Sequence, residues 1–180
     1  MIQDNNNYKI LKLFMDYPLK GFKLREISRK INLGLPSVSN YVKELEKEGL
    51  IIKKDIHGNF LWFSEREKDL FKKYKIADKI ISIEKSGLLV FLDEMYEFPN
   101  IILFGSSVLG EDFERSDLDL CIISEVKKEI NTSKYENKLK KPIQLFIFNK
   151  KIFKSLELSN PELFNNIING IVLRGALKIR

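Results

Sequence analysis

Cysteine and histidine are almost absent from this chain of 180 residues, which has one of each, Cys121 and His57. A single cysteine excludes an internal disulfide and a zinc site built from several thiolates. A single histidine argues against a metal site made of imidazoles, and against a Ser-His-Asp triad unless His57 itself takes part. Metal binding in this chain therefore depends on oxygen ligands, above all carboxylates.

Long hydrophobic runs are also missing. The longest, such as residues 87–92 and 100–104, are far too short to span a bilayer. Residues 1–7 are polar and lack the basic and then apolar design of an export signal. We therefore expect a cytoplasmic protein with no membrane partner. Hydrophobic residues still make up 44% of the chain, enough for a packed core in one domain or two small ones.

Positive charge exceeds negative charge, and the excess is greatest near the N-terminus. The chain has a net charge of +6, and its first 64 residues alone contain 11 basic and 7 acidic side chains. Such a balance is compatible with a nucleic acid partner without proving one.

The first third of the chain has the pattern of three helices followed by a hairpin. Apolar residues at helical spacing predict helices over residues 8–17 and 25–31, and a third that begins near Pro36 and ends at Gly49. Residues 50–54 and 60–64 alternate as two strands, with residues 55–59 as the hairpin tip.

This order resembles the winged helix-turn-helix domains of archaeal and bacterial regulators, over about residues 6–64. The most telling run is LREISRKINLGLPSVSNYVKELEKEGLI, residues 24–51. The resemblance implies a transcription regulator that binds double-stranded DNA, with two chains paired on two half-sites. Winged helices also serve as protein–protein modules, and that alternative stays open.

On such a domain the DNA contacts would come from the third helix and from the wing, which is the hairpin. Serine, asparagine and lysine side chains can reach base edges and phosphates. Three glutamates of the helix, Glu44, Glu46 and Glu48, dilute its positive charge. The expected DNA-binding residues are Ser37, Ser39, Asn40, Lys43, Lys47, Lys53, Lys54 and His57.

The rest of the chain alternates between helical and strand patterns. We expect a first domain over residues 1–64, a helical connector over 65–87 and a second domain over 88–180. The predicted strands of the second domain are residues 100–104, 118–124 and 142–148, and its predicted helices are 88–96, 149–158 and 161–168. Residues 127–141 look like a polar connection, and residues 171–179 are ambiguous between helix and strand.

The segment with the clearest chemistry is LFGSSVLGEDFERSDLDLCI, residues 103–122. A buried strand leads into a Gly-Ser turn, and Asp117 and Asp119 follow about ten residues later on the next strand. Residues two apart on a strand point to the same face, so the two carboxylates lie side by side. Two like charges that close are costly unless a cation joins them, and Mg²⁺ suits such hard oxygen ligands.

These residues resemble the nucleotidyltransferase superfamily of DNA polymerase β, in particular its minimal members, over about residues 88–180. Gly105 and Ser106 match the position that holds the triphosphate of ATP or another nucleoside triphosphate. Asp117 and Asp119 match the acids that hold Mg²⁺ and take part in catalysis. The two resemblances together imply an α+β protein, with a winged helix-turn-helix domain followed by a small mixed-sheet nucleotidyltransferase-fold domain.

Two positions depart from the family pattern. The third carboxylate that active members usually supply from a later strand falls at Gln144, which can neither act as a base nor bind a metal strongly. Glu136 and Glu129 are less favoured substitutes. Leu109 stands where minimal members often have an arginine.

Two functions therefore stay open. In one, the chain binds Mg-ATP and DNA and transfers a nucleotidyl group to an unidentified acceptor, such as a partner protein. In the other, it is a transcriptional regulator whose inactive nucleotidyltransferase domain senses a nucleotide or docks a protein.

The remaining polar residues near the motif are expected to be structural or solvated. Glu111, Asp112 and Glu114 are interpreted as a solvated acidic surface. Ser107 is interpreted as structural, and Cys121 as a small buried side chain rather than a reactive thiol.

Overall fold

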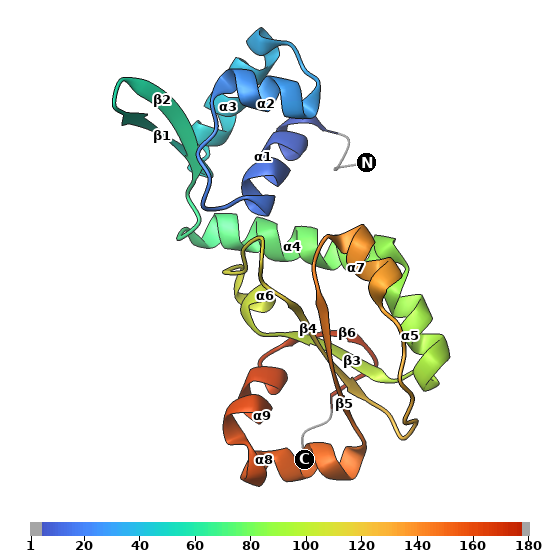
Figure 1. Cartoon of the computed structure of the whole chain (residues 1–180). Coiled ribbons are helices and arrows are strands. Elements are labelled where there is room, and N and C mark those ends of the chain that lie inside the picture. The colour runs from blue at the N-terminus through green and yellow to red at the C-terminus, as the bar shows by residue number, and fades with distance from the viewer. Residues whose placement is uncertain (1–4, 178–180) are drawn as a thin grey trace. The chain divides into compact units, whose positions relative to one another are not determined.

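The computed structural model describes residues 5–177 and divides the chain into two compact units (Figure 1). The first comprises residues 1–75 and the second residues 76–180. The division falls inside one long helix, α4 (Asp69–Ser86), which lies in the stretch predicted as a helical connector.

The first unit consists of helices packed around an aromatic and aliphatic core, with a hairpin at the end. Its elements are α1 (Asn6–Asp16), α2 (Leu24–Ile31), α3 (Leu35–Lys47), β1 (Ile51–Ile56) and β2 (Asn59–Ser64). Phe14, Phe22, Ile27 and Val38 are fully buried in one cluster. The predicted order of three helices and a hairpin is confirmed.

The hairpin tip is shorter than predicted. Strand pairing extends to Ile56 and Asn59, so only His57 and Gly58 form the turn. Both have positive φ, 51° and 79°, as the tight turns that suit the twist of a hairpin require. The Asp55 carboxylate accepts a hydrogen bond from the Gly58 N–H at 2.8 Å and so closes the turn.

The second unit is a four-stranded mixed sheet with helices on both faces, and the predicted α+β class is confirmed. The sheet order is β5-β4-β3-β6, and only β4 and β5 run parallel. Its strands are β3 (Asn100–Phe104), β4 (Leu118–Ile123), β5 (Ile143–Phe148) and β6 (Ile171–Arg174). Its other helices are α5 (Leu88–Tyr96), α6 (Ser106–Leu109), α7 (Ser133–Leu139), α8 (Lys150–Ser159) and α9 (Pro161–Ile168).

Alternate residues of β4 enter two different cores. Leu118, Leu120 and Ile122 pack with residues of α4, α5 and α7 on one face of the sheet. Cys121 and Ile123 pack with residues of α8 and α9 on the other face (Figure 1). The period-two alternation of a strand therefore places Asp119 on the face that α8 and α9 cover.

The structure corrects the prediction for residues 127–141 and resolves part of the ambiguous stretch 171–179. The connection predicted over residues 127–141 contains a helix, α7, because Tyr135 is buried and stacks on Phe91 with ring centroids 5.0 Å apart. Of the ambiguous stretch, residues 171–174 form strand β6, while residues 178 and 179 lie outside the described part of the chain. Arg174 holds this strand to two helices through Glu84 and Asp93.

No helix within residues 5–177 is both long enough and apolar enough to cross a membrane. The longest of them, α4, contains many charged residues.

Candidate functional site

The turn after β3 brings the backbone close to a carboxylate. Gly105 has φ 73° and ψ −155°, a backbone conformation that residues with a Cβ rarely adopt. A Cβ on Gly105 would lie only 2.5 Å from Oδ2 of Asp119. Glycine is therefore needed here twice, for its backbone angles and for the space beside the Asp119 carboxylate.

The two aspartates differ in their surroundings. Asp119 is the second residue of β4 and is half-buried, whereas Asp117 directly precedes the strand and is exposed. Burial, and then the neighbouring charge of Asp117, raise the pKa of the Asp119 carboxyl above its ordinary value. The pair is therefore a place where a bound cation would lower the free energy of the ionised form.

Gln144 lies directly beside Asp119. The parallel pairing of β4 and β5 sets Asp119 opposite Gln144, so the two side chains share a face, and Gln144 is exposed. Its amide oxygen is a neutral donor to a metal. The sheet register thus puts an amide, not a carboxylate, next to the acid pair.

The alternative acid Glu136 is engaged elsewhere. Its Oε1 atom accepts hydrogen bonds from the Ile143 N–H and the Thr132 hydroxyl, both at 3.1 Å. Within residues 5–177 no three His, Cys, Asp or Glu side chains gather as a metal-binding group. Two carboxylates and an amide suit one Mg²⁺ that keeps waters and phosphate oxygens as further ligands. They lack the charge of a site that holds two metal ions.

Other residues near the turn have distinct environments. Leu109, at the end of α6, is 57% exposed. The Ser107 side chain is buried, and its hydroxyl has no hydrogen-bond partner among the described residues. Cys121 is fully buried, and burial raises the pKa of its thiol to about 12, so the thiol stays protonated at neutral pH. The expectation of a small buried side chain at Cys121 is confirmed.

The interpretation of Asp112 as a solvated acid is wrong. Asp112 is 1% exposed and forms ion pairs with Lys79 at 2.8 Å and Lys141 at 3.0 Å. The lysines come from α4 and from the residue before Pro142, far from Asp112 in sequence. Since no local pattern links these three residues, sequence reasoning had no signal for their contact.

The exposed side of α3 presents polar and basic side chains. Asn40, Lys43 and Lys47 recur every three or four residues and are exposed, opposite the buried Val38 and Val42. Of the other residues expected on DNA, Ser37 is exposed and Ser39 is half-buried.

Two of the three acids that dilute this charge are held at the flanks of α3. The Glu44 carboxylate accepts a hydrogen bond from the Asn7 amide of α1 at 2.7 Å. The Glu46 carboxylate accepts one from the Lys53 N–H of β1 at 3.3 Å. These bonds direct both acids away from the middle of the exposed face, which leaves Asn40, Lys43 and Lys47 there.

The wing holds its cations over aromatic rings. The ammonium of Lys53 lies 3.9 Å from the ring centroid of Phe60, and that of Lys54 lies 5.5 Å from the centroid of Phe63. Both lysines and His57 are exposed. Cation–π contacts restrict these lysines without removing their charge, so they remain available to phosphates.

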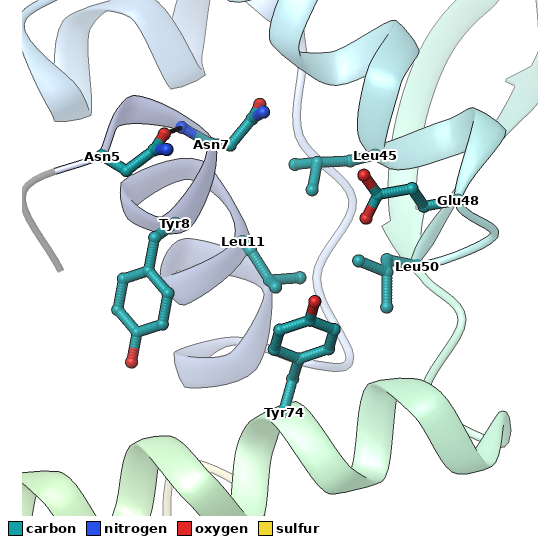
Figure 2. A pocket seen from close by; sticks show the side chains of 8 residues that line it. All are labelled: Asn5, Asn7, Tyr8, Leu11, Leu45, Glu48, Leu50 and Tyr74. Carbon is teal, nitrogen blue, oxygen red and sulfur yellow. Dashed lines mark hydrogen bonds between the residues drawn. The ribbon is translucent and has the colours of Figure 1, made fainter. Parts of the chain in front are cut away.

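A hollow in the first unit lies apart from these residues (Figure 2). It has a volume of about 170 Å³ and opens between α1, the end of α3 and Tyr74 of α4. None of the residues expected to contact DNA lines it. Its lining residues are Asn5, Asn7, Tyr8, Leu11, Leu45, Glu48, Leu50 and Tyr74.

Replacing Asp119 by asparagine is expected to raise the melting temperature of the metal-free protein at neutral pH. The pKa of Asp119 is higher in the folded state than in the unfolded chain, so ionisation costs the folded state more. The gain should shrink as pH falls through the folded-state pKa and vanish below the ordinary aspartate pKa of about 4. Thermal unfolding in a chelator between pH 4 and pH 8 measures it.

Asp117→Asn is the control for this experiment. It removes only the smaller cause, the charge next to Asp119, and should give a smaller gain. A lower melting temperature for Asp119→Asn at neutral pH would contradict the prediction, because it would mean that the ionised carboxylate stabilises the fold.

Comparison with protein families identifies both parts of the chain. Residues 21–52 match the winged helix-turn-helix DNA-binding family, and residues 85–168 match the nucleotidyltransferase domain family. A search of curated proteins found no match. The first match covers α2, α3 and the start of β1, and the second contains Gly105, Asp117, Asp119 and Gln144. The chain thus joins a winged helix-turn-helix DNA-binding domain to a nucleotidyltransferase domain.

Proposed function

We propose that this protein is a DNA-binding transcription regulator whose nucleotidyltransferase domain binds a magnesium nucleoside triphosphate such as ATP without transferring its nucleotidyl group. One observation carries the proposal. The Gly105 backbone lies against the carboxylate of Asp119, and the residue paired with Asp119 on the next strand is Gln144. The first contact favours nucleotide binding, and the second removes the base that transfer needs.

The case for a nucleotide is electrostatic and steric. Asp119 is ionised at a cost in the folded protein, and a bound cation would offset that cost. Gly105 leaves the space beside the carboxylate open, and the half-exposed Ser106 follows it. A turn of this kind can direct backbone N–H groups and a hydroxyl toward phosphate oxygens. Bound Mg²⁺ would neutralise phosphate charge and link the triphosphate to Asp117 and Asp119.

The case against transfer rests on proton chemistry. An attacking hydroxyl must lose its proton to a nearby base, and an amide cannot accept it. Gln144 stands at the position beside Asp119, and Glu136 is committed to the Ile143 N–H and the Thr132 hydroxyl. A regulator in which nucleotide binding changes the affinity for DNA requires no such proton transfer.

The case for DNA rests on the exposed face of α3 and the wing. Asn40, Lys43 and Lys47 lie on one face, and the carboxylates of Glu44 and Glu46 are bonded at its flanks. Such a helix can enter the major groove while wing lysines meet the phosphates. We propose that two chains pair on two half-sites, as helix-turn-helix readers commonly do.

Calorimetry tests nucleotide binding. The wild type should bind ATP only with Mg²⁺, and the double variant Asp117→Asn/Asp119→Asn should lose measurable binding because the cation loses both carboxylates. Glu114→Gln is the matched control: it removes one charge from an exposed residue of the adjoining loop and should bind as the wild type does. Equal binding by the wild type and the double variant would refute this site.

Nucleotidyl transfer is the second candidate, favoured by the intact Gly-Ser turn and acid pair. With α-labelled ATP, the wild type should transfer no label to itself, to DNA or to proteins of a cell extract. Gln144→Glu adds a third carboxylate beside Asp119 and should bind a second Mn²⁺ per chain in the presence of nucleotide. Label transfer by the wild type that Asp119→Asn abolishes would establish the enzyme instead.

DNA binding is tested by its dependence on salt. Each lysine that neutralises a phosphate adds about 0.9 to the slope of log affinity against log salt. Lys43→Ala/Lys47→Ala should therefore weaken binding to duplex DNA and lower that slope by about 2. Lys9→Ala/Lys12→Ala removes the same number of positive charges from α1, outside the proposed DNA-binding residues, and should change neither quantity. Equal effects of the two double variants would contradict the proposed face.

A further inference from the structure

A buried group of charges includes Asp112, in the loop that leads to Asp117, and has no role in the function proposed above. The Asp112 side chain is 2% exposed, and it meets Lys79 at 2.8 Å and Lys141 at 3.0 Å. The two lysine side chains are themselves only 13% and 12% exposed. Buried charges are costly to desolvate, and an apolar replacement is often as stable. Overall stability alone is therefore a weak explanation for this group.

Besides its ion pair with Asp112, Lys141 forms hydrogen bonds to the loop that contains Asp112. Its ammonium also donates hydrogen bonds to the carbonyl oxygens of Phe113, at 2.6 Å, and Ser116, at 3.2 Å. An ammonium has three N–H donors, so these two carbonyls and Asp112 match its full capacity. The Ser116 hydroxyl in turn accepts a hydrogen bond from the Phe113 N–H at 3.0 Å. Residues 112–116 thus form a closed turn around the Lys141 ammonium.

This turn ends directly before Asp117, and Lys141 lies directly before the strand of Gln144. The Leu118 N–H donates to the carbonyl of Pro142 at 2.9 Å, which begins the pairing of β4 with β5. Lys141 therefore holds the loop on one side of Asp117, while the sheet holds Leu118 on the other side. The backbone position of the exposed aspartate depends on both.

We propose that Lys141 is a positioning residue for the nucleotide site. It holds the turn of residues 112–116 so that the Asp117 carboxylate stays beside Asp119, and the buried Asp112 orients its ammonium. The inference rests on the proposed binding of a magnesium nucleotide. Lys79 acts on the same carboxylate from α4, whereas Lys141 adds the bonds to the loop carbonyls.

The two lysines supply a matched pair of variants. Lys141→Met and Lys79→Met each remove one similarly buried ammonium and each leave the other lysine paired with Asp112, so both should fold. Lys141→Met should weaken Mg-ATP binding about 10- to 100-fold, as loss of a residue that orients a metal ligand commonly does. Lys79→Met should bind Mg-ATP much more tightly than Lys141→Met, because it leaves the bonds from Lys141 to the loop carbonyls in place. Lys141→Arg, which retains charge and several donors, should recover most of the affinity.

Hydrogen exchange of the backbone amides of residues 111–117 is the second readout, and it requires no nucleotide. Exchange in this segment should be faster in Lys141→Met than in Lys79→Met, while residues 143–148 exchange alike in both. If the wild type binds no Mg-ATP, the proposed function fails, and exchange still shows whether Lys141 holds the loop.

The affinity measurements could overturn this inference in two ways without affecting the proposed function. One is wild-type Mg-ATP affinity in Lys141→Met. The other is an equal loss of Mg-ATP affinity in Lys141→Met and Lys79→Met when the two variants also have the same melting temperature. The three charges would then stabilise the fold in general, and Lys141 would have no separate role at the site. Unchanged exchange of residues 111–117 in Lys141→Met would also count against it.

Discussion

The close approach of the Gly105 backbone to the Asp119 carboxylate is the constraint around which the second unit is built. Antiparallel pairing sets Phe104, the last residue of β3, opposite Asp119, so the chain must turn at Gly105 directly over the carboxylate. Only glycine combines φ 73° with the lack of a Cβ at 2.5 Å from Oδ2. The register of β3, β4 and β5 then makes Phe104 and Gln144 the residues paired with Asp119.

Two aspartates in this region show opposite ways of holding a negative charge. Asp112 is buried and balanced by two lysines, so its position is determined by the fold. Asp119 is half-buried beside another acid, and burial, then the charge of Asp117, raise its pKa above the ordinary value. The charge of Asp112 is thus already neutralised within the protein, whereas a bound cation would offset the cost of ionising Asp119. The ion group and the acid pair therefore have complementary parts in the proposed site.

In the first unit, hydrogen bonds from neighbouring elements separate the acidic side chains of α3 from its basic ones. The net charge of α3 says little about DNA, because glutamates and lysines alternate along it. Hydrogen bonds from Asn7 and from the Lys53 backbone draw Glu44 and Glu46 to the flanks, and the exposed face keeps Asn40, Lys43 and Lys47. The contacts that shape this face come from α1 and β1, the elements packed on either side of α3. The character of the surface thus depends on packing as much as on composition.

Local patterns by themselves predicted the order of most elements and the Gly-Ser and Asp-x-Asp motif, and the resemblance of these segments to known families predicted the two domain types. Helical and alternating periodicities, and turn residues such as Gly49 and Gly58, act over a few residues and can be read from the chain. Only the tertiary structure decided that Gln144 pairs with Asp119, that Tyr135 makes a helix of a polar stretch, and that Asp112 is buried between Lys79 and Lys141. Each of these depends on strand register or on side chains distant in sequence, and such contacts form only when the whole sheet and its helices are packed.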